Sequence, residues 1–291
     1  MSAAATTLVA AKPRGRVLGA IFMGYLLLSL AIGFALLLWL LVDIAATGLP
    51  YLDQALFLND PSADPAIAGA RPAILGTLYM GALLLVFTVP LGVGTAIYLE
   101  EYADKERWYN RLLELNIQNL AAVPSIVYGI LGLAFLVRGL ALGRVLLAGA
   151  MILTLLVLPV VIIASREAIR AVPGSIRQGG FALGATKWQV VWRQVLPAAA
   201  PGMATGSILA LSRAIGETAP LLLVGALTYV AFNPSLLDQF TVLPIQIFQW
   251  TSRPQEEFKV LAAAAIIVLL AILLTLNALA IWVRNRYQKR W

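Results

Sequence analysis

Long apolar runs separated by short polar stretches dominate the chain. The runs cover approximately residues 17–47, 72–99, 117–137, 145–164, 197–230 and 260–283. Each run approaches or exceeds the roughly 20 mostly apolar residues that a helix needs to cross the hydrocarbon core of a bilayer. The pattern therefore predicts an all-α integral membrane protein with about six transmembrane helices, in contact with the lipid bilayer.

The composition supports a membrane protein and excludes several kinds of site. Of 291 residues, 61% are hydrophobic and 12% are charged, whereas a soluble domain carries about 25% charged residues. Cysteine and histidine are absent, which excludes disulfides, thiolate nucleophiles, a Ser-His-Asp triad and the commonest metal ligands. We expect no catalytic residue, no metal site and no cofactor.

The distribution of basic residues predicts an orientation. With the N-terminus inside, fifteen of the 21 Lys and Arg residues fall on the cytoplasmic side, five fall outside, and Arg213 lies within a span. Because cytoplasmic loops of membrane proteins are enriched in Lys and Arg, we expect both termini in the cytoplasm. The net charge of +7 then reflects these loops, and no nucleic-acid partner is expected.

The same pattern predicts the domain organisation. A cytoplasmic tail covers residues 1–16, and the first helix with an outer loop covers 17–71. A transmembrane domain covers 72–285 and contains a cytoplasmic loop at about 165–197. A second cytoplasmic tail covers 286–291.

Two charged residues, Arg213 and Glu217, interrupt the fifth apolar run. A charge at the bilayer centre costs roughly 2.5–3.5 kcal/mol on insertion scales, so it persists where it is paired or faces water. Residues four apart share one helix face. One interpretation is a structural ion pair between helices. The favoured one is a polar pathway for a charged substrate, since the guanidinium fork of arginine fits an oxyanion.

The loop at 165–197 is too polar to span and contains Gly184 before Lys187. A short helix-turn-helix with glycine at the bend would place a knob on the membrane face. It is either an amphipathic linker in the interface or a docking element for a cytoplasmic partner, and we favour the second. No Gly-x-x-x-x-Gly-Lys-Ser/Thr loop occurs, so ATP-driven transport would need its nucleotide-binding domain on another chain.

The spacing from Gly184 to Leu196-Pro197 resembles the cytoplasmic Glu-Ala-Ala loop of ABC importer permeases. That loop reads Glu-Ala-Ala, three residues, Gly, nine residues, Ile, any residue, Leu-Pro. Here the first three positions hold Gln178, Gly179 and Gly180, and the Ile position holds Gln194. Because glycine weakens a helix by roughly 1 kcal/mol relative to alanine, we expect the docking helix to begin later or to be less rigid.

Two longer motifs narrow the resemblance. The segments 116–129 (NIQNLAAVPSIVYG) and 212–222 (SRAIGETAPLL) are similar to those of phosphate-specific ABC permeases, of the PstA type. The segment 243–247 (LPIQI) fits the same type. The resemblance covers about residues 70 to 285.

The resemblance implies a type I ABC importer in the bacterial cytoplasmic (inner) membrane. Its partners would be a homologous PstC-type permease, two cytoplasmic ATPase subunits and an extracytoplasmic phosphate-binding protein. Substrate-pathway residues implied by position are Arg213, Glu217, Thr218, Asn119, Ser125 and Tyr128. Coupling-loop residues implied by position are Gly184, Ala185, Thr186, Lys187, Leu196 and Pro197.

Three other functions stay open at this point. The chain could be a permease for another oxyanion such as molybdate or sulfate. It could instead be an ATP-independent channel or secondary transporter, although no clear inverted repeat is present and the Gly184 loop would then have no evident partner. A membrane-embedded enzyme is disfavoured by the absence of histidine, cysteine and clustered carboxylates. In the importer, ATP-driven closure would move the Gly184 loop and, through it, the fifth helix.

Overall fold

The computed structural model describes residues 14–104, 106–225 and 229–287. Every regular element in these three ranges is helical. Most of the two predicted tails, residues 1–13 and 288–291, lies outside the described residues. The first helix begins at Arg14, so the last three residues of the tail predicted at 1–16 are helical.

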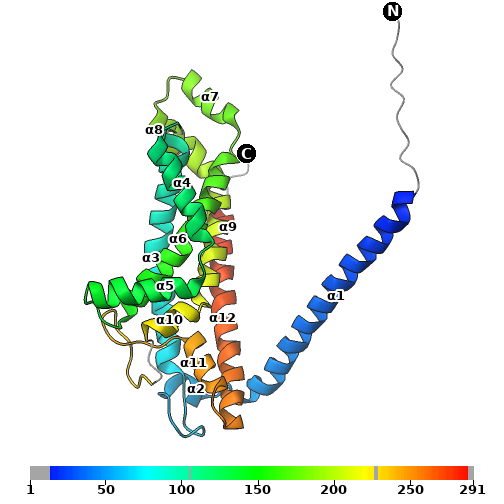
Figure 1. The fold of residues 1–291 in the computed structure, drawn as a ribbon, viewed down its shortest axis with the longest axis vertical. Helices are drawn as coiled ribbons and strands as arrows, with labels where there is room; N and C mark the ends of the chain where they lie inside the picture. The colour runs from blue at the N-terminus through cyan, green and yellow to red at the C-terminus, as the bar shows by residue number, and fades with distance from the viewer. Residues whose placement is uncertain (1–13, 105, 226–228, 288–291) are drawn as a thin grey trace, which may run out of the picture.

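Twelve α-helices form the described fold (Figure 1). They are α1 (Arg14–Gly48), α2 (Gln54–Leu58), α3 (Arg71–Ile97), α4 (Trp108–Ala121), α5 (Ser125–Gly132), α6 (Leu146–Arg170), α7 (Gly174–Ala182), α8 (Lys187–Val190), α9 (Leu196–Ile215), α10 (Ala219–Val224), α11 (Leu243–Thr251) and α12 (Glu256–Tyr287). Short π-helical turns extend three of them: η2 (Tyr98–Tyr102) follows α3, η3 (Leu133–Gly139) follows α5, and η4 (Val191–Val195) joins α8 to α9.

Five stretches are long and apolar enough to cross a membrane. They begin at Leu18 in α1, at Arg71 in α3, at Leu146 in α6, at Lys187 in α8–α9 and at Glu256 in α12. The pair formed by α4 and α5–η3 passes the same test only when it is taken together. The chain is therefore a multi-pass membrane protein with five or six spans among its described residues.

The third apolar run, predicted as one helix over 117–137, is broken. Helices α4 and α5–η3 are bent by 106° across a gap of three residues that ends at Pro124. Proline lacks an N–H and disfavours helical dihedrals in the residue before it, here Val123. Figure 1 shows the outcome: α5 lies across the bundle, whereas α4 runs along it.

The fifth run, predicted over 197–230, is also broken. Helix α9 ends at Ile215, and α10 begins only at Ala219 with proline in its first turn. Gly225 ends α10 with a φ of +84°, which favours glycine. One apolar stretch of sequence thus folds as a long helix, a short break and a six-residue helix.

The core of the bundle is formed where α3, α6 and α9 pack against one another. Small residues allow these helices to approach closely, as is typical of membrane bundles. A Cβ on Gly206 of α9 would lie 2.4 Å from the Cβ of Ala164, and one on Gly92 of α3 would lie 2.6 Å from Val161 Cγ1. The breaks are therefore supported by a tightly packed frame.

Helix α1 stands apart from this frame. It meets α12 at its C-terminal end, where a Cβ on Gly48 would lie 2.7 Å from the backbone of Ala263. From there it leans away from the bundle (Figure 1), and its apolar window has no buried residue.

Helix α3 meets the loop before α11 through backbone and hydroxyl contacts. The hydroxyl of Thr77 accepts a hydrogen bond from Leu243 N (2.9 Å). A Cβ on the preceding Gly76 would lie 2.1 Å from the carbonyl oxygen of Thr241. The backbone of this loop therefore packs directly against α3 at Gly76, where a side chain would leave no room for it.

We expect Gly76→Ala to lower the melting temperature of the detergent-purified chain by several degrees, because the methyl group must displace backbone atoms. Gly94→Ala is the matched control on the same helix, since its Cβ would meet nothing within 4 Å. Gly94→Ala should leave the melting temperature unchanged or slightly raised. Equal melting temperatures for the two variants would contradict this packing.

Candidate functional site

The charged pair of the fifth run lies where α9 ends. The side chain of Arg213 is in the last turn of α9, and Glu217 lies in the break before α10. Arg213 Nε is 3.7 Å from Glu217 Oε1, and the two side chains are 76% and 20% exposed. Among the described contacts, the pair is formed within one segment, between α9 and the break that follows it. The structural ion pair and the substrate pathway both stay predictions.

Two contacts locate Arg213 along the length of the bundle. Thr205 of α9 accepts a hydrogen bond from Arg284 near the end of α12 (2.7 Å). Arg213 lies eight residues further along α9, about 12 Å at 1.5 Å per residue. The second contact is counted from the first residue of α3. Gly81 lies ten residues, about 15 Å, into that helix, and a Cβ added at Gly81 would lie 3.3 Å from Cδ1 of Ile215, two residues after Arg213. Counted along these helices, Arg213 therefore lies between the two ends of the bundle.

The predicted pathway residues of the third run lie around its break. Asn119 is exposed near the end of α4, and Ser125 is the partly buried first residue of α5. Tyr128 is buried, and its hydroxyl donates to Leu120 O (2.9 Å). Tyr128 therefore braces α5 against the end of α4, and the pathway role of the three residues stays a prediction.

The structure brings the two breaks together through the helices that follow them. Helix α5 packs on α10, and a Cβ on Gly129 would lie 2.7 Å from Pro220 Cα. Thr218, the residue before α10, is partly exposed, and its side chain does not cap the helix. Asn119, Ser125 and Tyr128 are therefore on one broken element and Arg213, Glu217 and Thr218 on the other, with α5 and α10 in contact between them.

The helix-turn-helix predicted around Gly184 is confirmed. Helices α7 and α8 are joined at Gly184, whose φ is +76°. Thr186 then begins α8 with a capping box: its hydroxyl accepts from Gln189 N (3.3 Å), and Gln189 Oε1 accepts from Thr186 N (2.9 Å). The two short helices thus form an ordered protrusion at one end of the bundle, which we call the docking loop (residues 174–197).

Exposed apolar side chains cover the tip of the docking loop. Leu183 is 87% exposed, and Phe181 beside it is also exposed. Trp188 and Trp192, both exposed, stack with their ring centroids 5.2 Å apart. Large apolar side chains grouped on a polar protrusion mark a contact surface. The predicted coupling residues included none of these four side chains, although two Trp residues at a helical spacing in a basic loop were a usable signal.

The remaining predicted coupling residues lie at the base of the docking loop. Ala185 and Leu196 pack in an apolar cluster with Val190. Lys187 places its ammonium group 5.2 Å from the ring centre of Tyr102. Pro197 follows η4, and it is the second residue of α9. Ala185 and Leu196 are therefore packed inward, whereas the four large apolar side chains named above are exposed.

The departures from the Glu-Ala-Ala pattern have a structural reason in one case. Helix α7 begins at Gly174 and includes Gln178, Gly179 and Gly180, so the expectation of a later start is wrong. A Cβ on Gly180 would lie 2.7 Å from Gln194 Oε1. The small residue at 180 and the larger polar one at 194 are thus packed against each other, whereas Gly179 has open space around it.

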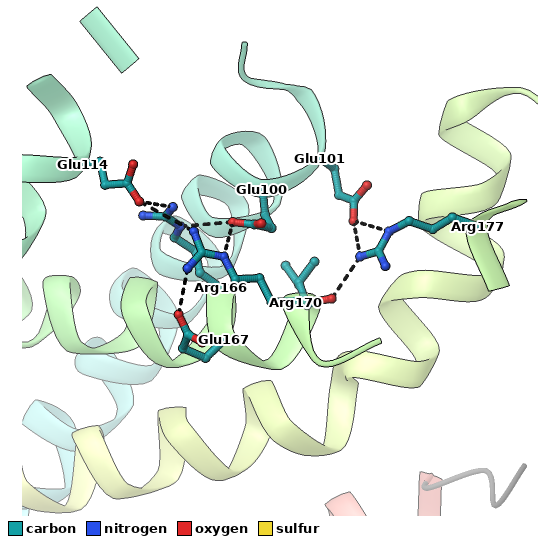
Figure 2. Close-up of polar contacts among 8 residues, drawn as sticks. Glu100, Glu101, Glu114, Arg166, Glu167, Arg170 and Arg177 are labelled. Carbon is teal, nitrogen blue, oxygen red and sulfur yellow. Dashed lines mark hydrogen bonds and ion pairs between the residues drawn. The ribbon is translucent and has the colours of Figure 1, made fainter. Parts of the chain in front are cut away.

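An ion network at the docking-loop end was not predicted. Glu100 and Glu101 of η2 and Glu114 of α4 pair with arginines of α6 and α7 (Figure 2). The sequence showed these residues only as separate groups of loop charges. Partners 52 to 76 residues apart carry no local signal of their pairing.

The comparison with protein families identifies the chain. Residues 88–291 match the family described as "Binding-protein-dependent transport system inner membrane component". The chain belongs to this family. As a family member it is a transport subunit.

Known relatives agree with this assignment. The chain is 34% identical to "Phosphate transport system permease protein PstA 1" of Mycobacterium tuberculosis (strain CDC 1551 / Oshkosh) over 221 residues, covering 74% of this chain and 70% of the relative. It is also 34% identical to "Phosphate transport system permease protein PstA" of Yersinia pestis over 262 residues, covering 88% and 87%.

Solved structures confirm the fold. One chain of a bacterial alginate ABC transporter in complex with an alginate pentasaccharide-bound periplasmic protein superimposes with a TM-score of 0.67 at 17% identity, covering 96% of this chain and 99% of that chain. A chain of the MetNI methionine ABC transporter gives a TM-score of 0.58 at 18% identity, covering 74% and 92%. The fold is therefore that of type I ABC importer permeases, as the sequence motifs predicted.

Proposed function

We propose that this permease is one transmembrane subunit of an ATP-driven importer of inorganic phosphate. The phosphate transport permeases among its relatives support this substrate. The observation that carries the proposal is Arg213, a largely exposed guanidinium in a long apolar run between the two ends of the bundle. Among the described residues, its ion-pair contact is with Glu217 and is long at 3.7 Å. The arginine therefore keeps donors available for an anion.

The chemistry of the Arg213–Glu217 pair suits the binding and release of a phosphate ion. Phosphate carries one to two negative charges at neutral pH, and arginine binds such oxyanions through two parallel N–H donors. Glu217 offsets part of the positive charge, so an anion is attracted to the site and can still leave it. Asn119, Ser125 and Thr218 are proposed to line the same pathway, because the helices that follow the two breaks pack on each other.

The exposure of Arg213 supports a half-pathway completed by a second permease. A guanidinium facing lipid at mid-depth would cost roughly 2.5–3.5 kcal/mol or more, so protein or water must cover it. Helix α1 differs, since its apolar surface is stable in lipid alone. We therefore propose that a homologous PstC-type subunit closes the pathway over Arg213 and Glu217.

The docking loop supports an ATPase partner. Its exposed apolar tip fits a groove on cytoplasmic ATPase subunits, of which we propose two copies, one per permease. ATP hydrolysis would take place there. This places α7 and α8 in the cytoplasm, with both termini on that side of a bacterial inner membrane. The opposite end, with α2 and α11, would then face an extracytoplasmic phosphate-binding protein.

We expect Arg213→Gln to lower ATP-driven phosphate uptake by about 10- to 100-fold in proteoliposomes holding the complete complex, since a charged hydrogen bond to an anion contributes about 1.5–3 kcal/mol. Arg286→Gln is the matched control, because Arg286 is exposed at the end of α12. The control should leave uptake unchanged. Unchanged uptake in Arg213→Gln would remove Arg213 from the pathway, and preferential transport of sulfate or molybdate by the unmodified complex would reassign the substrate.

The docking proposal predicts a specific cross-link. The chain has no cysteine, so Leu183→Cys at the exposed tip provides a single thiol on this subunit. It should cross-link to the ATPase subunit in at least one nucleotide state, as judged by a shifted band on a denaturing gel. Val191→Cys, at a buried position of η4, should not. Absence of any Leu183→Cys cross-link in all nucleotide states would rule out this docking surface.

A further inference from the structure

Six charged side chains connect four elements at the docking-loop end of the bundle. They come from η2, α4, α6 and α7, and Figure 2 shows them facing one another across the gaps between these elements. The members of this ion network are Glu100, Glu101, Glu114, Arg166, Arg170 and Arg177.

Arg177 ties the docking loop to the bundle. From α7, its Nε and Nη2 lie 3.1 and 2.7 Å from Glu101 Oε1 on η2. The same guanidinium donates from Nη1 to Val172 O (2.7 Å) and from Nη2 to Ile169 O (2.9 Å). Ile169 O belongs to the last turn of α6, where helix carbonyls lack intrahelical partners, and Val172 O lies two residues beyond the end of that helix. One side chain therefore holds α7 against two other elements.

Glu100, adjacent to Glu101, continues the network into α6 and α4. Its Oε2 lies 2.9 Å from Arg170 Nε and 3.4 Å from Arg166 Nε. Arg166 in turn places Nη2 2.5 Å from Glu114 Oε1 of α4. The side chains of Arg166 and Glu100 are only 8% and 7% exposed. Because buried ions have no water to replace a lost partner, η2 and α6 are held together by the buried pair. The partly exposed Glu114, 37% exposed, joins α4 to the same arginine.

From Glu114 the contacts lead to the charged pair. Helix α4 ends about two turns after Glu114. Near that end, the hydroxyl of Tyr128 in α5 donates a hydrogen bond to Leu120 O. Helix α5 then packs through Gly129 on Pro220 of α10, the helix that follows Glu217. A continuous series of described contacts thus joins α7 to the second break.

We propose that the ion network is a second coupling route between the ATPase and the transport pathway. A displacement of α7 passes through Arg177 and Glu101 to η2, and through Arg166 and Glu114 to α4 and α5. It acts beside the covalent route from α8 through η4 into α9. The ion network leads to α5, and the covalent route leads through α9 to α10. Because α5 and α10 are in contact, a movement of one break relative to the other involves both routes. Arg177, Glu101 and Glu114 are positioning residues in this route, which rests on the proposed function.

The test uses single cysteines as labelling sites in the complete complex. Ile126→Cys on α5 and Leu209→Cys on α9 are exposed positions for spin labels that report each route separately. In an otherwise unmodified chain, adding ATP should change both spectra. With Glu114→Gln, the change at position 126 should be lost and the change at position 209 should persist. Phosphate transported per ATP should fall about fivefold or more, while the ATP hydrolysis rate stays within about twofold.

Glu167→Gln is the matched control, because Glu167 pairs with Arg170 on its own helix (3.0 Å) and joins no second element among the described contacts. It should leave both labels and the transport ratio unchanged. Glu101→Gln interrupts the same route nearer to α7 and should reproduce the Glu114→Gln result, including where the latter does not assemble.

Two results would overturn the inference: both labels respond normally in Glu114→Gln and Glu101→Gln with an unchanged transport ratio, or both labels lose their response together. A different result would count against the proposed function itself. If the unmodified complex shows no phosphate uptake and neither label responds to ATP, the proposed function is wrong, and the inference is wrong with it.

Discussion

The cost of placing charge and free backbone groups in a bilayer is the constraint on which the rest of this structure depends. A hydrocarbon core offers no partner for a guanidinium or for the open end of a helix. Yet the side chain of Arg213 is largely exposed between the two ends of the bundle, and two of the apolar runs are broken. Such features are stable only where protein and water replace lipid, which is why we propose that a second permease covers this face of the bundle.

The fold supports these breaks by packing them on each other and on a rigid frame. Helices α5 and α10 meet where Gly129 allows the backbone of Pro220 to approach, and Tyr128 braces the first break. At the docking-loop end, a buried ion pair joins α6 to η2, and a partly exposed one joins α6 to α4. The irregular segments are therefore held at both ends by contacts that a movement of α7 would shift as a unit.

The sequence predicted the apolar runs, the docking loop and the charged pair, because length, glycine and an unexpected charge are local signals. It did not predict that the runs at 117–137 and 197–230 are broken. Apolar residues suit a straight span and a bent one equally, and Pro124 alone did not distinguish them. The pairing of Glu100 and Glu114 with Arg166 depends on residues 52 to 66 positions apart. The fit of Gly180 against Gln194 is likewise a property of tertiary packing.

The most direct test of the central claim is whether the surface at Arg213 borders water. In the assembled complex, Arg213→Cys should react with a charged, membrane-impermeant thiol reagent applied from both sides, in at least one nucleotide state, and phosphate should slow the reaction. Leu30→Cys, at an exposed position on the apolar helix α1, should resist the reagent. Protection of the cysteine at 213 in every nucleotide state, equal to that at position 30, would contradict the account.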